Sequence, residues 1–247
     1  MVNSGPLRFE LVIPAYNEGK NLPILLDRAV KSAQAAGYND HEFKLVVVNN
    51  GSTDDSCAVL ESLSKTALGT WFRVVEVTAN QGYGYGLWCG LNSTKAPVVG
   101  WTHADMQTDP VDAFKACQMV SESRASKVLV KGKRHGRNWK DSFVSHVFEG
   151  FTRLMLGLKT REINAQPKVF NRELLALLTA PPKSFAFDLY ALYHAERAGF
   201  TVQAIPVLFP PRIHGVSNWA ATFFGRYKTI LGMISYIQSL CRSEGRL

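Results

Sequence analysis

Apolar and polar residues alternate along the chain in blocks that predict strands and helices in turn. Residues 9–13 form a short apolar run closed by Pro14, whereas residues 21–36 carry apolar side chains at intervals of three and four. The first pattern is typical of a buried strand and the second of a helix with one buried face. The same patterns predict further strands at 44–48, 72–77, 97–101, 127–130 and 201–208, and helices at 57–63, 83–91, 111–122, 142–156, 172–178, after 187 and at 223–240.

Strands that alternate with helices indicate an α/β fold with a mainly parallel sheet and crossover helices. The 247 residues contain no repeat, low-complexity segment or linker, so we expect a single domain. Ligands of such sheets bind beyond the carboxyl ends of the strands. Polar residues gather at four of these predicted ends, at 16–18, 49–52, 80–82 and 103–105. We therefore expect the functional site at this edge.

Composition and charge narrow the function. The four cysteines form no C-x-x-C pair, which argues against a zinc ribbon or a disulfide framework. No secretory signal and no apolar run of the ~20 residues that span a bilayer is visible, so we expect a cytoplasmic protein. A net charge of +8 indicates an anionic partner, either lipid headgroups, a phosphorylated substrate or nucleic acid. No nucleic-acid-binding motif is visible, so we expect no nucleic acid.

Five segments, taken in order, resemble the motifs of the family 2 glycosyltransferases with the GT-A fold. Within that family they resemble the branch of dolichyl-phosphate mannose synthase and the bacterial polyprenyl-phosphate glycosyltransferases. The segments are residues 11–18, 46–54, 80–84, 101–110 and 212–217. The resemblance implies a Rossmann-like nucleotide-sugar-binding half at about 8–110, an acceptor half at about 111–218 and an amphipathic helix at about 221–241.

The loop after the first strand contacts the base and ribose in the family. The resemblance therefore assigns nucleotide-sugar binding to Pro14, Ala15, Tyr16, Asn17 and Glu18. The residues alone are also typical of a proline-initiated turn in which Glu18 is a helix-start charge.

The second loop departs from the family pattern. Asn49 and Asn50 replace the two leading carboxylates of the family's Asp-Asp-Gly-Ser-x-Asp motif, whereas Gly51, Ser52 and Asp54 match it. An amide still accepts a hydrogen bond from a base and also donates one, but it lacks the charge of a carboxylate. Base recognition by Asn49 is therefore expected, with the identity of the base left open. The alternative is an Asx turn that caps the next helix through Ser52 and Asp54.

The third loop contains glycines before a predicted helix. Asn80, Gly82 and Gly84 match the family's Asn-x-Gly-x-Gly segment, and their spacing does not fit a dinucleotide-binding fingerprint. Glycines let the backbone approach a ligand closely, and a helix N-terminus favours a diphosphate.

The fourth loop is the candidate metal site. His103, Ala104 and Asp105 occupy the position of the family's Asp-x-Asp, whose carboxylates hold a divalent cation on the donor diphosphate. Magnesium usually takes one or two carboxylates plus substrate phosphates, so Asp105 alone suffices. An imidazole ligand suits manganese better than magnesium, and the alternative for His103 is a structural hydrogen bond. Gln107 is expected to orient Asp105 or a sugar hydroxyl.

The acceptor side is basic, and a basic loop is expected at 131–140 after the strand at 127–130. Residues 124–140 contain seven lysines and arginines and no acid. The resemblance places Lys133 and Arg134 at the acceptor phosphate, with Arg212 and Ser217 as further ligands. Charge runs are usually solvated, and this alternative applies most to Arg137 and Lys140.

The acceptor decides whether a base is needed. A hydroxyl acceptor requires a general base, for which Asp188 is the candidate, whereas a lipid phosphate is already anionic. Asp188 is equally typical of a helix N-terminal charge. Residues 164–168 resemble the acceptor-side lining of the family, but the sequence assigns them no role.

The hypothesis is an inverting glycosyltransferase that moves a sugar from a nucleotide-diphosphate donor to a polyprenyl phosphate at the cytoplasmic membrane face. One alternative keeps the donor and uses a hydroxyl acceptor in cell-surface polysaccharide synthesis. The other is a non-catalytic sugar-nucleotide-binding subunit, suggested by the missing acids at positions 49, 50 and 103. The apolar face of the last helix fits a peripheral membrane contact, packing on its own domain, or a partner subunit in a homo-oligomer.

Overall fold

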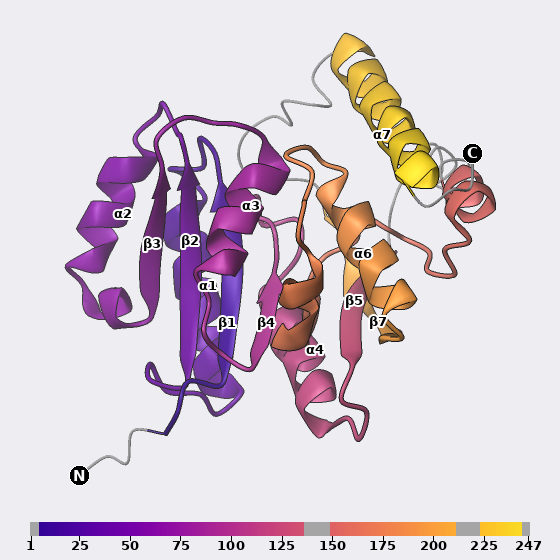
Figure 1. The fold of residues 1–247 in the computed structure, drawn as a ribbon. Helices are drawn as coiled ribbons and strands as arrows, with labels where there is room; N and C mark the ends of the chain where they lie inside the picture. Colours follow the sequence, from indigo (N-terminus) through magenta and orange to yellow (C-terminus); the bar gives the residue numbers. More distant parts are fainter. Residues whose placement is uncertain (1–4, 136–148, 211–222, 244–247) are drawn as a thin grey trace.

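The computed structural model describes residues 5–135, 149–210 and 223–243, with the side chains of the last helix described from residue 231. One seven-stranded sheet runs through it in the order β3-β2-β1-β4-β6-β5-β7 (Figure 1). The strands are β1 (Phe9–Ala15), β2 (Phe43–Asn50), β3 (Phe72–Val77), β4 (Val98–Trp101), β5 (Val128–His135), β6 (Lys168–Asn171) and β7 (Thr201–Leu208).

Helices cover both faces of this sheet. They are α1 (Leu22–Ala35), α2 (Ser56–Ser64), α3 (Tyr83–Asn92), α4 (Val111–Glu122), α6 (Phe187–Arg197) and α7 (Phe223–Ser243), with short 3-10 helices η1 (Ala67–Thr70) and η2 (Arg172–Leu177). Residues 149–156 are also helical. α1 and α4 pack on one face and α3 and α6 on the other (Figure 1). Central strands covered on both sides account for the continuous apolar runs in the sequence.

The predicted α/β class is confirmed, with one strand that the sequence did not reveal. β6 pairs antiparallel with both β4 and β5, whereas every other pair in the sheet is parallel. No strand was expected at Lys168–Asn171, because a four-residue segment that begins with lysine has no clear period. β5 also continues through His135, where a basic loop was expected, and the helix predicted at 172–178 is a 3-10 turn.

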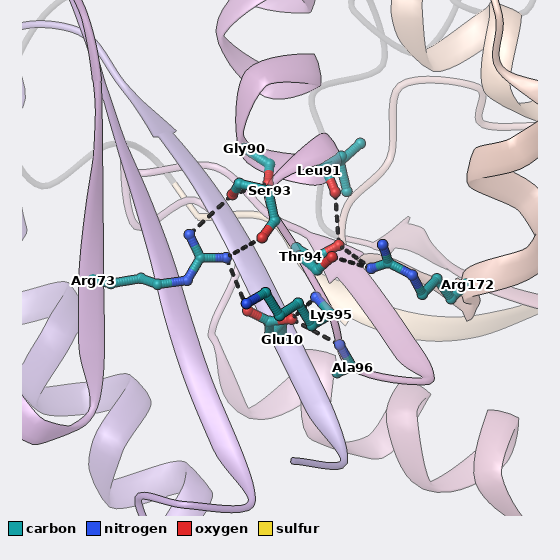
Figure 2. A network of polar contacts seen from close by, with 9 residues as sticks. All are labelled: Glu10, Arg73, Gly90, Leu91, Ser93, Thr94, Lys95, Ala96 and Arg172. Carbon is teal, nitrogen blue, oxygen red and sulfur yellow. Dashed lines mark hydrogen bonds and ion pairs between the residues drawn. The ribbon is translucent and has the colours of Figure 1, made fainter.

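Charged residues at the amino edge of the sheet form a structural network (Figure 2). Glu10 of β1 is 2% exposed and its Oε1 accepts a hydrogen bond from Arg73 at 2.9 Å. Its Oε2 accepts from the backbone N–H groups of Lys95 and Ala96. Arg172 binds the carbonyl of Thr94 in the same connection. These contacts fix the connection between α3 and β4, so this edge is engaged in holding the fold together.

The described half of α7 packs on its own chain. Ile237 and Cys241 are fully buried in the core formed with α3 and α6, and the Cys241 thiol donates to the carbonyl of Met155 at 3.4 Å. Packing on the domain is therefore the alternative that the structure supports for this part of the helix. Among the described residues, no helix combines the length and the apolar character that a bilayer crossing requires.

Candidate functional site

The loops after β1 and β2 form one hydrogen-bonded unit at the carboxyl edge. Asn17 adopts a left-handed backbone conformation with φ 57°. Its Oδ1 accepts from the backbone N–H of Thr53 at 2.8 Å, and its own N–H donates to Ser52 Oγ at 3.1 Å. Asp54 accepts from the N–H of Gly19 at 3.2 Å and from that of Ser56 at 3.0 Å. These contacts form the turn that was considered as an alternative role for Ser52 and Asp54. They hold the two loops in one conformation.

These contacts also hold Asp54 in its ionised form. Burial raises the pKa of its carboxyl, but the hydrogen bonds from Ser56 and Gly19 outweigh that effect and lower the pKa overall. The side chain therefore serves the loop framework as an anion, and Glu18 joins the framework through its N–H, which donates to Ser56 Oγ at 3.1 Å.

Both amides of the second loop are used as hydrogen-bond donors. Asn49 Nδ2 donates to Glu76 Oε2 at 2.8 Å, and Asn50 Nδ2 donates to the carbonyl of Gly82 at 3.2 Å. A carboxylate at position 49 would face Glu76, its neighbour on β3, with like charge. This contact gives a physical reason for asparagine at position 49. It also adds Glu76, whose side chain is exposed, to the candidate site. Glu76 could not be predicted from the sequence, because only the pairing of β2 with β3 brings it beside Asn49.

The glycines of the third loop make room for the protein itself. A Cβ at Gly82, where φ is 114°, would lie 2.3 Å from the carbonyl oxygen of Lys183, and a Cβ at Gly84 would lie 2.2 Å from that of Pro182. Gly51 likewise leaves space for the backbone N–H of Asn80. The close backbone approach predicted from these glycines is thus to neighbouring chain segments. Their contact with a donor diphosphate stays a prediction.

Asp105 and His103 meet the first residue of α3 beyond β4. Asp105 is 3% exposed, and its Oδ1 accepts from the N–H of Gln107 at 3.1 Å. The His103 ring packs edge-on against Tyr83, with centroids 5.8 Å apart. Burial raises the pKa of Tyr83 well above its usual value, and the nearby charges of Asp188 and Asp105 raise it further. Two of the expected carboxylates therefore lie around one tyrosine.

The donor set at this point fits a cation shared with a substrate. No three His, Cys, Asp or Glu side chains cluster in the part of the chain that the structure describes. One protein carboxylate together with substrate phosphates is an arrangement that magnesium commonly uses, so Asp105 fits it. The His103 ring is committed to packing against Tyr83, which makes it the less suitable ligand.

Gln107 connects this loop to the segment that follows β7. Its Nε2 donates to the carbonyl of Pro210 at 3.2 Å. Pro210 stands directly before the segment that carries Arg212 and Ser217, which lie outside the described residues, as do Arg137 and Lys140. The contact of Gln107 is therefore with the protein backbone.

The two basic residues predicted at the acceptor differ in their surroundings. Lys133 is exposed on β5. Arg134 is mostly buried, forms a 2.6 Å ion pair with Glu162, and lies over the ring of Phe209 at 5.4 Å. Glu162 offsets the charge of Arg134, so Lys133 is the more available cation of the two.

Asp188 is the partner of a buried lysine. Its side chain is 4% exposed, and its Oδ1 binds Lys168 Nζ and accepts from Gln166 Nε2 at 2.8 Å. Lys168 is fully buried and also donates to the carbonyl of Ala165 at 3.1 Å. These contacts give residues 164–168 the role that the sequence left open, because they anchor this segment to α6. A carboxylate committed to two internal donors is poorly placed to take a proton from a substrate.

A second buried lysine was missed. Lys131 of β5 is 2% exposed, and its Nζ donates to the carbonyl of Gly132 at 2.7 Å. Burial, assisted by the charge of Lys168, lowers the pKa of Lys131 to about 7. The sequence placed this residue at the start of a basic loop, and only the pairing of β5 with β6 puts it inside.

Comparisons with known proteins agree on one family. The protein-family model described as Glycosyl transferase family 2 matches residues 10–191. Polyprenol monophosphomannose synthase of Mycolicibacterium smegmatis is 24% identical over 86% of this chain and 81% of its own length. An undecaprenyl-phosphate 4-deoxy-4-formamido-L-arabinose transferase of Pseudomonas savastanoi is 28% identical over 55% of this chain. The match spans only 39% of that transferase.

A solved structure shows the same fold. Glucosyl-3-phosphoglycerate synthase from Mycobacterium tuberculosis, in complex with Mn2+, UDP-glucose and phosphoglyceric acid, has a TM-score of 0.70 at 19% identity. The likeness covers 95% of this chain and 80% of that one. It confirms the GT-A fold predicted from the order of the motifs.

Proposed function

We propose, since the chain belongs to glycosyl transferase family 2, that it transfers a sugar from a nucleotide-diphosphate donor to a polyprenyl phosphate with inversion at the anomeric carbon. The observation that carries the proposal is the position of Asp105. It lies at the carboxyl edge beyond β4, two strands away in the sheet from the basic end of β5. A leaving diphosphate and an attacking phosphate both need positive charge, and this edge offers a place for each.

The nucleotide is assigned to the hydrogen-bonded loops after β1 and β2. We assign the ribose and base to residues 14–18 and to Asn49, Gly51, Ser52 and Asp54, with Asn80, Gly82, Gly84, Ala104 and Gln107 toward the diphosphate and sugar. Their mutual hydrogen bonds make this surface preformed, which reduces the entropy lost on binding. Glu76 beside Asn49 restores a negative charge at the base, where the family pattern has its carboxylates.

Asp105 would hold a divalent cation, magnesium or manganese, on the donor diphosphate, with His103 as a candidate second ligand. The cation would offset the charge that develops on the leaving nucleotide diphosphate. Gln107 fixes the carboxylate of Asp105 through its backbone N–H and ties the loop to Pro210. The retained carboxylate argues for catalysis over a purely sugar-nucleotide-binding subunit.

The acceptor lies at the end of β5. Lys133 binds its phosphate, with Arg134, Arg212 and Ser217 as further ligands. A phosphate monoester is anionic at neutral pH and needs no general base, which agrees with the internal pairing of Asp188. Exposed Leu208 and Leu154, at 76% and 84%, offer apolar surface for a peripheral contact with the cytoplasmic face of a membrane.

A thermal-shift screen of sugar nucleotides with and without Mn2+ tests the donor site. A ligand that binds only the folded state at 100 times its Kd adds about 2.7 kcal/mol to the free energy of unfolding. We expect at least one sugar nucleotide to raise the melting temperature in a Mn2+-dependent way.

The matched variants are Asp105→Ala and Asp109→Ala. Asp109 lies in the same loop but is paired with Arg28 on the surface, at 2.8 Å. The shift should disappear in Asp105→Ala and persist in Asp109→Ala. A shift that survives in Asp105→Ala, or no shift with any sugar nucleotide, contradicts the proposed donor site.

A further inference from the structure

Three donor side chains form a row across the sheet at the level where β4 ends. Trp101 of β4 is the register partner of Lys168 on β6, and Lys168 is the register partner of Lys131 on β5. Register partners on adjacent strands point to the same face. Lys168 Nζ accordingly lies over the Trp101 ring, 5.4 Å from its centroid. All three residues are at most 2% exposed, so the row is a buried group of donors.

This row contains two lysines and contacts one carboxylate. Asp188 binds Lys168, whereas no ion pair formed by the described residues includes Lys131, whose Nζ donates to the carbonyl of Gly132. Four further charged groups affect the pKa of Lys131 through electrostatic interactions of opposite sign, which partly cancel. They are Lys168 on β6, Arg134 on β5, Glu162 before β6 and Glu149 in the helical segment 149–156.

Buried polar atoms border the same row. The Tyr83 hydroxyl is buried, and the side chains of Asp188 and Trp101 both act on it. Gln166 Oε1 is buried without a hydrogen-bond partner among the described residues, whereas Gln166 Nε2 donates to Asp188. The row therefore lies in a polar part of the interior.

Lys131 is also costly for the fold. A methionine would fill the same space on a buried strand without the desolvation of an amine and without a second lysine beside it. Costly polar groups of this kind are retained where they serve binding or catalysis. The residue stands two positions before Lys133, at the edge where the substrates are proposed to meet.

We infer that Lys131 is a phosphate-binding residue of this site, and that its amine takes up a proton from solvent when a substrate phosphate binds. The inference rests on the proposed function. The proton adds to the neutral amine of Nζ and forms an ammonium ion, which then donates to the phosphate oxygens. No other bond forms or breaks. The phosphate belongs either to the lipid acceptor or to the donor diphosphate.

Isothermal titration calorimetry at pH 8, in buffers with different ionisation enthalpies, tests the inference through the number of protons taken up. The probes are farnesyl phosphate, which stands for the acceptor, and UDP with Mn2+, which stands for the donor. A phosphate monoester with a second pKa near 6 is already fully ionised at this pH, so the uptake reports on the protein. We expect the wild-type protein to take up about one proton with one of the two probes, and that probe identifies the phosphate.

Substitutions separate this role from a structural one. Lys131→Met should bind the same probe about ten- to a hundredfold more weakly, without proton uptake. Lys131→Arg, which is always charged, should retain binding and also show no uptake. The control is Lys127→Met, at the amino end of β5, where an exposed lysine donates to the carbonyl of Ala198 at 3.1 Å. It should behave like the wild type.

Two results would overturn the inference. Only the second would also contradict the proposed function. Binding of farnesyl phosphate or UDP without proton uptake and with equal affinity in Lys131→Met removes the role of Lys131 and leaves the proposed function standing. Failure of the wild-type protein to bind either probe removes both. The first result needs no arginine variant, so it stands even where Lys131→Arg does not fold.

Discussion

We expect replacement of Asp105 by Asn to lower the rate of sugar transfer by about 1,000-fold or more and to leave the fold intact. The amide oxygen of asparagine still accepts the hydrogen bond that Gln107 donates to Oδ1, so the loop keeps its shape. Only the negative charge is lost. In the proposed function this carboxylate would hold the cation that offsets the charge of the leaving diphosphate, so we expect its loss to lower both the rate of the chemical step and the affinity for the donor.

The measurement is the initial rate of transfer at saturating donor and acceptor, with the melting temperature of each variant as a check on folding. Asp109→Asn is the control, because it removes a carboxylate from the same loop without touching the proposed cation site. Its activity should stay within about twofold of the wild type, since exposed ion pairs contribute little. An Asp105→Asn enzyme that keeps more than about a tenth of the activity contradicts the assignment of Asp105.

We expect replacement of Asp188 by Ala to lower the free energy of unfolding by about 3–5 kcal/mol. The substitution leaves the ammonium of Lys168 fully buried without its carboxylate, and it also removes the acceptor of Gln166 Nε2. Urea unfolding followed by circular dichroism measures the change as a shift in midpoint at constant slope.

The double variant Asp188→Leu with Lys168→Met removes both charges and keeps the side-chain volume. It therefore distinguishes the effect of the ion pair on stability from the effect of packing. Replacing both charges by apolar side chains of similar size should recover most of the lost stability, because no charge then remains buried alone. A single Asp188→Ala substitution that costs less than about 1 kcal/mol would show that the pair is not essential. Loss of transfer with intact donor binding and folding in Asp188→Asn would favour the hydroxyl acceptor, for which Asp188 acts as base.

The elements that the sequence predicted well are those with a strong period of their own. β1 and α1 lie within two residues of their expected bounds, because apolar runs and helical stripes report burial directly. β6 gave no such signal. Its four residues are held as a strand by neighbours on both sides, β4 and β5, which are distant in sequence. A strand formed mainly by tertiary pairing is not visible in a local pattern.

The same distinction applies to the site. The order of the polar loops placed the candidate residues at one edge of the sheet, as expected of parallel strands. Their partners could not be predicted. Glu76 beside Asn49, Glu162 beside Arg134 and Lys168 beside Asp188 are each distant in sequence from the residue that they contact. The resemblance placed Arg134 at the acceptor phosphate, and the structure pairs it with Glu162. Asp188 is the candidate base for a hydroxyl acceptor, and the structure pairs it with Lys168. The roles proposed for both residues stay predictions.

A product assay shows whether the protein transfers a sugar to a lipid phosphate. The purified protein is incubated with Mn2+, undecaprenyl phosphate and, in turn, each of a panel of sugar nucleotides, and the lipid fraction is analysed by mass spectrometry and NMR. We expect a polyprenyl-phosphate sugar from at least one donor, with the anomeric configuration inverted relative to the donor. Transfer from the same donors to hydroxyl acceptors alone, or a product with retained configuration, would contradict it.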